Sequence, residues 1–208
     1  MLTDAELVAR ALEGRQEAFR EIVVRFERPI YSLVARMVQD PALAEDLAQE
    51  VFIKAFRRLD TYDPQRKLSS WLFKIAHNTT IDHLRRHAPE TVPLEVEKDD
   101  ERSGRGGLAA VLSDTGAQSP AAAAERRDMA RGLERAIARL RPEYRESVVL
   151  FYLEGASYQE ICEATGLPLG TVKTNLHRAR KELAQHMTDL GFGPREAGAG
   201  ETRGAPAS

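Results

Sequence analysis

The chain has 208 residues, of which 42% are hydrophobic and 30% charged, a balance typical of a folded protein rather than a disordered one. Its 14 glycines and 10 prolines exclude collagen-like and low-complexity chains, and no apolar stretch approaches the roughly 18 residues of a membrane span. One cysteine, Cys162, excludes an internal disulfide and a thiolate zinc cage. The first residues include acids and form no apolar signal core, so we expect a reduced, cytoplasmic protein without membrane contact of its own.

The net charge of −2 hides a segregation of charge along the chain. Residues 40–53 carry four acids and no base, whereas residues 66–87 carry five bases and one acid. Residues 171–181 carry four bases and no acid. Two basic surfaces and one acidic surface indicate DNA plus a separate protein partner, although acidic helix faces are often only solvated.

The first helices of a helical domain over residues 1–90 are marked by capping and apolar periodicity. Thr3 and Glu6 have capping-box spacing, in which a hydroxyl and a carboxylate each satisfy a free backbone donor. A second apolar stripe spans residues 19–37 at helical spacing. Pro29 lies inside that stripe, so we expect a kink or break there.

A third helix is predicted to begin at Asp40-Pro41, with an acceptor at the cap and proline in the first turn. Its expected buried face comprises Leu43, Leu47, Val51, Ala55 and Leu59. Residues 60–68 form a polar loop, and Ser69 is predicted to cap a fourth helix over residues 70–87.

The helical pattern stops after the fourth helix. Seven prolines and glycines interrupt residues 88–120, and residues 95–101 carry five acids and one base. We therefore predict a flexible acidic linker over residues 91–124, a second domain over residues 125–190 and a disordered glycine-rich tail over residues 191–208.

The second domain has the parts of a helix-turn-helix. Helices are expected over residues 121–140 and from Pro142 onward, and Ser157 and Glu160 form a second capping box ahead of a short helix. A turn containing glycine then leads to a last helix over residues 171–187. The predicted fold class is all-α, with two small helical domains joined by a flexible linker and a helix-turn-helix in the C-terminal one.

The last helix has two distinct faces. The face expected to pack inward comprises Val172, Leu176, Ala179 and Leu183. The opposite face carries donors suited to guanine edges and phosphates, namely Lys173, Thr174, His177, Arg178 and Lys181. The alternative is an ordinary solvated basic helix, which the capping box and the glycine turn disfavour.

The single cysteine and the histidines of the fourth helix each have both a structural and a functional interpretation. Cys162 lies within the first helix of the motif and is interpreted as a small core residue. His83 and His87, preceded by His77, have the spacing of metal ligands, but no carboxylate or thiol completes a site. We interpret the histidines as helix-surface residues near DNA and expect neither a metal nor another cofactor.

Three segments together resemble the extracytoplasmic-function (ECF) family of bacterial RNA polymerase sigma factors. Residues 44–56 (AEDLAQEVFIKAF) are similar to the polymerase-binding helix of the family, and residues 70–79 (SWLFKIAHNT) to its −10 promoter segment. Residues 155–161 (GASYQEI), with residues 170–180 (GTVKTNLHRAR), are similar to its −35 reader. The resemblance extends over residues 7–87 and 127–183.

The resemblance implies a role for each surface. Asp46, Gln49 and Glu50 share one helix face, and matching positions in the family bind the coiled coil of the clamp in the largest polymerase subunit. The residue matching Asn78 helps to line a pocket for a base flipped from the non-template strand, for which an amide is suitable. The expected −10 contacts are Arg66, Lys67, Trp71, Lys74, Asn78 and Arg85. Trp71 is either a stacking platform or a core residue.

The stripe of the fourth helix that carries Lys74 and Asn78 also includes Asp82 and Arg85, opposite Leu72, Ile75 and Ala76. The acidic residues 95–101 are expected to thread between the two domains and mimic nucleic acid in the polymerase cleft.

The implied function is promoter recognition, DNA melting and transcription initiation as a dissociable polymerase subunit rather than an enzyme. The implied partners are core RNA polymerase, through the clamp and the flap, promoter DNA and an anti-sigma factor. A conventional helix-turn-helix regulator is the alternative, disfavoured by the acidic face and the Asn78 segment. A hydrolase is a third possibility, which no nucleophile elbow, phosphate loop or metal motif supports.

Overall fold

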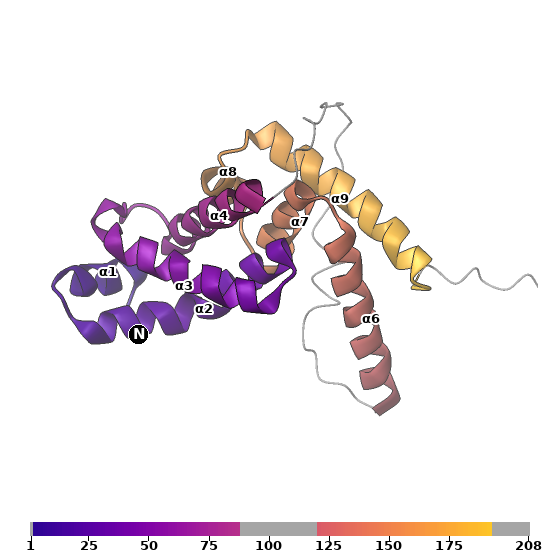
Figure 1. Ribbon diagram of the computed structural model, residues 1–208, viewed down its shortest axis with the longest axis horizontal. Coiled ribbons are helices and arrows are strands. Elements are labelled where there is room, and N and C mark those ends of the chain that lie inside the picture. Colours follow the sequence, from indigo (N-terminus) through magenta and orange to yellow (C-terminus); the bar gives the residue numbers. More distant parts are fainter. Residues whose placement is uncertain (1, 88–119, 193–208) are drawn as a thin grey trace, which may run out of the picture.

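The computed structural model describes residues 2–87 and 120–192, and every regular element in these two ranges is helical (Figure 1). The N-terminal half contains α1 (Asp4–Leu12), α2 (Gln16–Val38), α3 (Pro41–Arg57), a 3-10 turn η1 (Leu59–Thr61) and α4 (Leu68–His87). The C-terminal half contains α6 (Pro120–Arg139), α7 (Pro142–Val148), a π-helical segment η2 (Val149–Leu153), α8 (Tyr158–Thr165) and α9 (Leu169–Asp189). The all-α prediction is confirmed.

The predicted linker and tail fall mostly outside the described residues. Helix α6 begins at Pro120, inside the range 91–124 that was predicted as linker. The acidic run 95–101 and residues 193–208 of the tail are not among the residues that the structure describes.

The predicted caps of α1 and α3 are confirmed. The Thr3 amide donates to Glu6 Oε2 at 2.8 Å, and the Glu6 amide donates to Thr3 Oγ1 at 3.3 Å. Asp40 Oδ1 accepts from the amides of Ala42 and Leu43 at 3.0 and 3.2 Å, so its side chain satisfies two donors of the first turn of α3.

Two helix boundaries differ from the prediction. Helix α2 runs unbroken through Pro29 to Val38, because the residues around the proline, among them Ile30 and Leu33, are buried in the core and hold this segment in place. Helix α4 begins at Leu68 rather than at residue 70, so Ser69 lies in its first turn and is not its cap. The buried Leu68 side chain is anchored in the core, which extends the helix toward the N-terminus.

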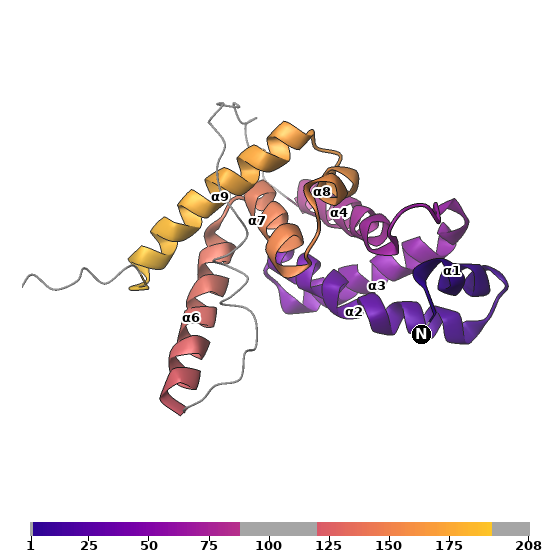
Figure 2. The same ribbon diagram turned by 180° about the vertical axis from the view of Figure 1, so that it is seen from behind.

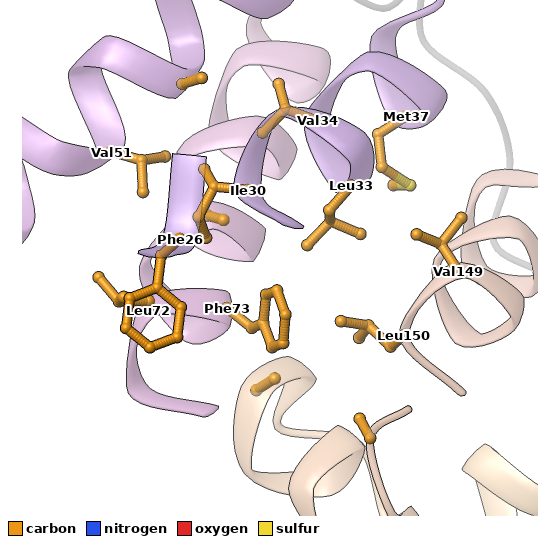
Figure 3. Close-up of a cluster of buried hydrophobic side chains, with 14 of the residues drawn as sticks. Phe26, Ile30, Leu33, Val34, Met37, Val51, Leu72, Phe73, Val149 and Leu150 are labelled. Atoms are coloured by element: carbon orange, nitrogen blue, oxygen red, sulfur yellow. The ribbon is translucent and has the colours of Figure 1, made fainter. Parts of the chain in front are cut away.

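The two halves share one hydrophobic core. Helix α4 packs against α8, and α2 packs against α7 and η2. Figure 3 shows Val149 and Leu150 of η2 facing Leu33 and Met37 of α2, with Phe73 of α4 between the halves. These side chains belong to a single buried cluster, so the halves form one packed body rather than two separate cores (Figures 1 and 2).

Arg145 of α7 ties together the ends of two helices. Its buried guanidinium donates to carbonyls near the C-terminal ends of α2 and α6 at 2.7–3.2 Å: Arg36, Met37, Ile137, Ala138 and Leu140. Burial lowers the pKa of Arg145, yet a guanidinium stays protonated in a protein. The cation thus satisfies carbonyls that a helix end leaves unpaired.

The C-terminal end of α9 folds back onto α6. Gly191 has a φ of +84°, and the amide of Phe192 donates to the Met187 carbonyl at 2.8 Å, which closes the end of the helix. The Phe192 ring then lies on Gly132, where a Cβ would collide with the Cε2 edge of the ring. No helix in the described ranges is long and apolar enough to cross a membrane.

Candidate nucleic-acid and polymerase interfaces

The loop between η1 and α4 is held by its own side chains. The buried Tyr62 donates its hydroxyl to the Arg66 carbonyl at 2.6 Å, and Asp63 Oδ1 accepts from the Gln65 amide at 2.9 Å. Burial raises the pKa of Tyr62, and the charges of Asp4 and Asp63 raise it further, so the hydroxyl remains a donor. This loop therefore has a defined shape beside α4.

A hollow of about 400 Å³, the −10 hollow, lies between this loop and α4. It is lined by Arg58, Thr61, Tyr62, Asp63, Arg66, Ser70, Trp71, Lys74, Ile75, Asn78 and Glu163. Four of the predicted −10 residues thus meet in one place, whereas the exposed Lys67 and Arg85 are not among the lining residues. Ile75, expected on the opposite side of α4, lines the hollow as well, which corrects that prediction: the stripe facing the hollow is wider than one row of residues.

Trp71 has both of the interpretations considered from the sequence. It is half-buried and contacts Tyr62 edge to face, with ring centroids 5.8 Å apart, yet it also lines the −10 hollow. Lys74 and Asn78 lie exposed one and two turns further along the helix. Sequence reasoning missed Tyr62, because nothing in the periodicity of a polar loop shows that one of its residues is buried.

The histidines of α4 do not come together as one cluster. His77 Nδ1 lies 2.6 Å from Glu146 Oε1, whereas His83 and His87 stack on each other with centroids 4.2 Å apart. Burial lowers the pKa of His83, and the nearby His87 and Arg86 charges lower it further. No group of three or more His, Cys, Asp or Glu in the described ranges is arranged to hold a metal ion.

The helix-turn-helix is formed by α8 and α9. The Ser157 amide donates to Glu160 Oε2 at 2.7 Å and the Glu160 amide donates to Ser157 Oγ at 3.2 Å, which confirms the second capping box. Gly166 ends α8 with a φ of +74°, a left-handed conformation that glycine adopts without strain. The inward face of α9 is confirmed, because Val172, Leu176, Ala179 and Leu183 are all buried.

The other face of α9 carries the predicted −35 residues. Lys181 is exposed, and Lys173, Thr174, His177 and Arg178 are half-buried. Thr174 Oγ1 donates to the Gly170 carbonyl at 2.9 Å, so its lone pairs are the part left to accept from a base. Helix α9 begins at Leu169, two residues before the predicted start. Cys162 of α8 is half-buried and burial raises the pKa of its thiol, which agrees with a structural role.

The acidic face of α3 is accessible. Asp46 and Gln49 are exposed, and the half-buried Glu50 pairs with Lys54, Nζ to Oε1, at 2.7 Å. Ile53 lies three residues after Glu50 and is 50% exposed, which places an apolar side chain beside the carboxylates. The sequence did not single out Ile53, because an apolar residue on a helix is ordinarily assigned to the core.

The surface formed by the η1–α4 loop and α4, here called the −10 surface after the residues predicted on it, is in contact with the C-terminal half. Lys67 Nζ lies 2.7 Å from Glu160 Oε1, and Arg66 Nη1 lies 3.7 Å from Glu163 Oε2. His77 of α4 meets the buried Glu146 of α7 as described above. Each of these pairs joins a basic side chain from the loop or α4 to a carboxylate from α7 or α8.

Comparison with known proteins relates both halves to one family. The family described as Sigma-70 region 2 matches residues 22–90, and the family described as Sigma-70, region 4 matches residues 130–183. The structure of CnrH in complex with the cytosolic domain of CnrY is 25% identical, with a TM-score of 0.62, and covers 89% of this chain and 97% of CnrH. The sigma factor RpoE in complex with the anti-sigma factor NepR from Bartonella quintana shares the fold, with 19% identity and a TM-score of 0.59 over 82% of this chain and 96% of that one.

Two further relatives have a higher sequence identity to this chain than these two solved structures have. The ECF RNA polymerase sigma factor SigW of Bacillus subtilis is 36% identical over 186 residues, covering 88% of this chain and 96% of SigW. The ECF RNA polymerase sigma-E factor of Escherichia coli K12 is 33% identical over 192 residues, covering 91% and 96% of the two chains. The chain therefore belongs to the ECF RNA polymerase sigma factors, which direct transcription initiation at promoters.

Proposed function

We propose that this sigma factor holds an unpaired base of the −10 element in the −10 hollow, with Asn78 reading the base edge. The observation that carries this proposal is the meeting of Asn78, Trp71, Lys74 and Arg66 in one hollow of about 400 Å³. That volume lies in the range of about 300–1,000 Å³ typical of small-ligand sites. It is thus sufficient for a single flipped base.

The chemistry of the hollow is suitable for single-stranded DNA. The Asn78 amide both donates and accepts, as a base edge requires, and the Trp71 ring supplies a face on which a base can stack. Lys74 and Arg66 supply positive charge for the neighbouring phosphates, while Lys67 and Arg85 extend this charge beyond the hollow. The arrangement fits a melted strand better than a duplex, whose bases are stacked and inaccessible.

The outward face of α9 is proposed to read the −35 element in the major groove. Residues near the N-terminus of a recognition helix approach base edges, and later residues approach phosphates. Lys173, Thr174 and His177 are therefore assigned to bases, Arg178 to the groove edge and Lys181 to phosphate.

The acidic face of α3 is proposed to bind the clamp of the largest polymerase subunit through Asp46, Gln49 and Glu50. Its accessibility supports this assignment, and the exposed Ile53 adds an apolar contact of the kind found at the centre of interfaces. The C-terminal half is proposed to contact the flap of core polymerase. In this scheme the chain works as a non-enzymatic, cofactor-free cytoplasmic subunit.

An anti-sigma factor is proposed as a further partner. The support comes from the sigma factor RpoE of Bartonella quintana, whose structure was determined in complex with the anti-sigma factor NepR. Affinity purification of this chain from uninduced cells should recover one inhibitor protein in addition to polymerase. Recovery of polymerase alone under several growth conditions would count against such control.

Run-off transcription of genomic DNA from the organism that encodes the chain tests the main proposal. Core polymerase is expected to produce a distinct set of transcripts only when the protein is added. Asn78→Ala should bind core normally but lose promoter opening by about 10-fold, which corresponds to one lost base contact of roughly 1–3 kcal/mol. Asp82→Asn, one turn further on the same exposed stripe and outside the hollow, is the matched control. Binding to duplex DNA without any core-dependent transcript would instead identify a conventional regulator.

A further inference from the structure

Leu169 is a large apolar side chain that the fold leaves exposed. Its exposed fraction is 46%, whereas Leu167, two residues earlier, packs against the hydrophobic core. In the described part of the C-terminal half, Met129 of α6 is the other exposed large apolar side chain. Because single exposed apolar residues are common on protein surfaces, the position of Leu169 decides whether it has a function.

Leu169 occupies the first position of α9, the second helix of the helix-turn-helix. The helix begins there after Pro168, whose backbone is extended with φ of −61° and ψ of 150°, and the Val172 amide donates to the Pro168 carbonyl at 3.0 Å. The Cα–Cβ bonds of a helix tilt toward its N-terminus. The Leu169 side chain therefore leans toward the N-terminal end of α9, which lies at the periphery of the molecule (Figures 1 and 2).

Leu169 also lies on the face of α9 that is proposed to read the −35 element. Positions 169, 173 and 177 are four residues apart, so they follow one another along one side of the helix. Lys173 and His177 are two of the residues assigned to bases. Gly170, which follows Leu169, is exposed and adds no side chain that could cover it. Leu169 thus places an apolar group one turn before Lys173 on a face of polar side chains.

The major groove offers an apolar group to such a residue, the C5-methyl group of thymine. The other groups on the base edges there are hydrogen-bond donors and acceptors, for which leucine has no partner. Contact with a guanine or cytosine edge would remove water from a polar group without replacing its hydrogen bond. Since the N-terminal residues of a recognition helix reach the base edges, a leucine at this end favours thymine.

We propose that Leu169 is a specificity-determining residue of the −35 reader and selects a thymine by contact with its methyl group. This inference rests on the proposed role of the outward face of α9. It adds an apolar contact to the contacts assigned to Lys173, Thr174 and His177. The thymine belongs to the base pair that the N-terminal end of α9 meets, on either strand of the duplex.

A selection experiment identifies this base pair. Holoenzyme formed from core polymerase and the full chain selects duplexes of a promoter found by run-off transcription, with the −35 element randomised. The wild type should enrich an A·T pair at one position where Leu169→Ala shows no preference, and Lys173→Ala should relax preference at a different position. Met129→Ala removes an exposed apolar side chain from α6 and should select as the wild type does.

Deoxyuridine then isolates the methyl group, because it keeps the O4 acceptor and the pairing edge of thymine and lacks its C5-methyl group. Replacing the selected thymine by deoxyuridine should weaken binding of the wild-type holoenzyme about fourfold, as expected when one methylene-sized group is no longer buried. Leu169→Ala should bind both duplexes with the same, weakened affinity. Leu169→Met, which keeps a long apolar side chain, should restore the difference. Fluorescence anisotropy of labelled promoter duplexes measures these affinities.

The outcomes separate the inference from the proposed function. The inference is overturned if the wild type enriches no A·T pair, or if Leu169→Ala distinguishes thymine from deoxyuridine as strongly as the wild type does. In either case a relaxed selection by Lys173→Ala keeps the assignment of α9 in place. If Leu169→Ala lowers the affinity for core polymerase without changing the selected sequence, Leu169 is a protein contact and the inference is wrong. If Leu169→Ala, Lys173→Ala and His177→Ala all select as the wild type does, α9 is not the −35 reader and the inference falls with it.

Discussion

Glu154 carries a carboxylate that folding partly buries. Its Oε1 accepts from Ser32 Oγ of α2 at 2.7 Å, across the contact between the halves. Burial raises the pKa of Glu154, against the opposing effects of the Ser32 hydrogen bond and the Arg36 charge. Because the folded-state pKa is above the unfolded one, folding binds a proton, and the charged form opposes folding at neutral pH.

Glu154→Gln is therefore expected to increase the free energy of unfolding at pH 7. The amide still accepts from Ser32, and the cost of burying a charge is gone. The difference from the wild type should shrink as the pH falls through the folded-state pKa of Glu154, where the wild type becomes neutral as well. Urea unfolding at a series of pH values measures this, and a destabilised variant at pH 7 would show that the charge is stabilising.

Lys173 and Lys181 lie two turns apart on α9, so their substitutions should affect −35 binding in different ways. Lys173→Ala is expected to cost roughly 1–3 kcal/mol at one base position and to relax preference there. Lys181→Ala should weaken binding to every sequence alike. It should also reduce the slope of log affinity against log salt concentration by about one. Binding to a panel of single-base −35 substitutions checks both. The assignment is inverted if Lys181→Ala alone alters sequence preference.

At the scale of single elements, the caps explain why short segments of this chain are helical. Helix α8 has eight residues, too few for a stable isolated helix, and it depends on the Ser157–Glu160 box, the Gly166 turn and the buried Ile161 and Ala164. Helix α3 instead combines a cap with an accessible acidic face, so its outer surface is available for a partner.

Reversing charge on α3 should abolish core binding without disturbing the fold. Asp46→Lys/Glu50→Lys places like charges against a basic partner, which costs several kcal/mol, or about 100-fold in affinity or more. Glu17→Lys/Glu27→Lys makes the same change of charge at exposed positions of α2 and should bind core as the wild type does. Equal core affinity of the two variants, measured by fluorescence anisotropy, would refute the assigned face.

The elements themselves were accessible from the sequence because their signals are local. Capping boxes, the Asp40-Pro41 start and the inward face of α9 depend on neighbours within one or two turns, and all are confirmed. The unbroken course of α2 through Pro29 and the early start of α4 depend instead on packing against distant residues, which periodicity does not report.

The candidate site likewise divides into residues with a local sequence signal and residues placed by distant contacts. Asn78, Trp71, Lys74 and Arg66 were identified from a contiguous motif and its adjacent loop, and the structure brings them together. Tyr62 and Glu163 were missed. The first is buried by the shape of a loop, and the second approaches from a helix some 85 residues later along the chain. No local pattern encodes a contact of that sequence separation.

At the scale of the whole molecule, the shared core predicts that the two halves unfold cooperatively, and this can be measured. The only tryptophan, Trp71, lies in the N-terminal half and the only cysteine, Cys162, in the C-terminal half. Each half thus carries one native probe of its own unfolding.

Trp71 fluorescence and Cys162 thiol reactivity are expected to report one urea midpoint in the wild type, because neither half unfolds without exposing the other's core residues. Arg145→Ala leaves carbonyls of α2 and α6 without this donor, at a cost of about 1–3 kcal/mol for each buried acceptor left unsatisfied, so it should destabilise the protein and separate the two midpoints. The exposed Arg139→Ala is the matched control. Separate midpoints in the wild type would mean that the halves are independent folding units.

The Phe192 ring seated on Gly132 has a consequence for the evolution of this protein. Since a Cβ at position 132 would collide with the ring, mutations at the two positions are not independent. A descendant that acquires a larger residue at position 132 must either move the aromatic ring at position 192 off this seat or lose it. The pair therefore restricts the order in which mutations can accumulate, and sequences of closely related chains should show the two positions varying together.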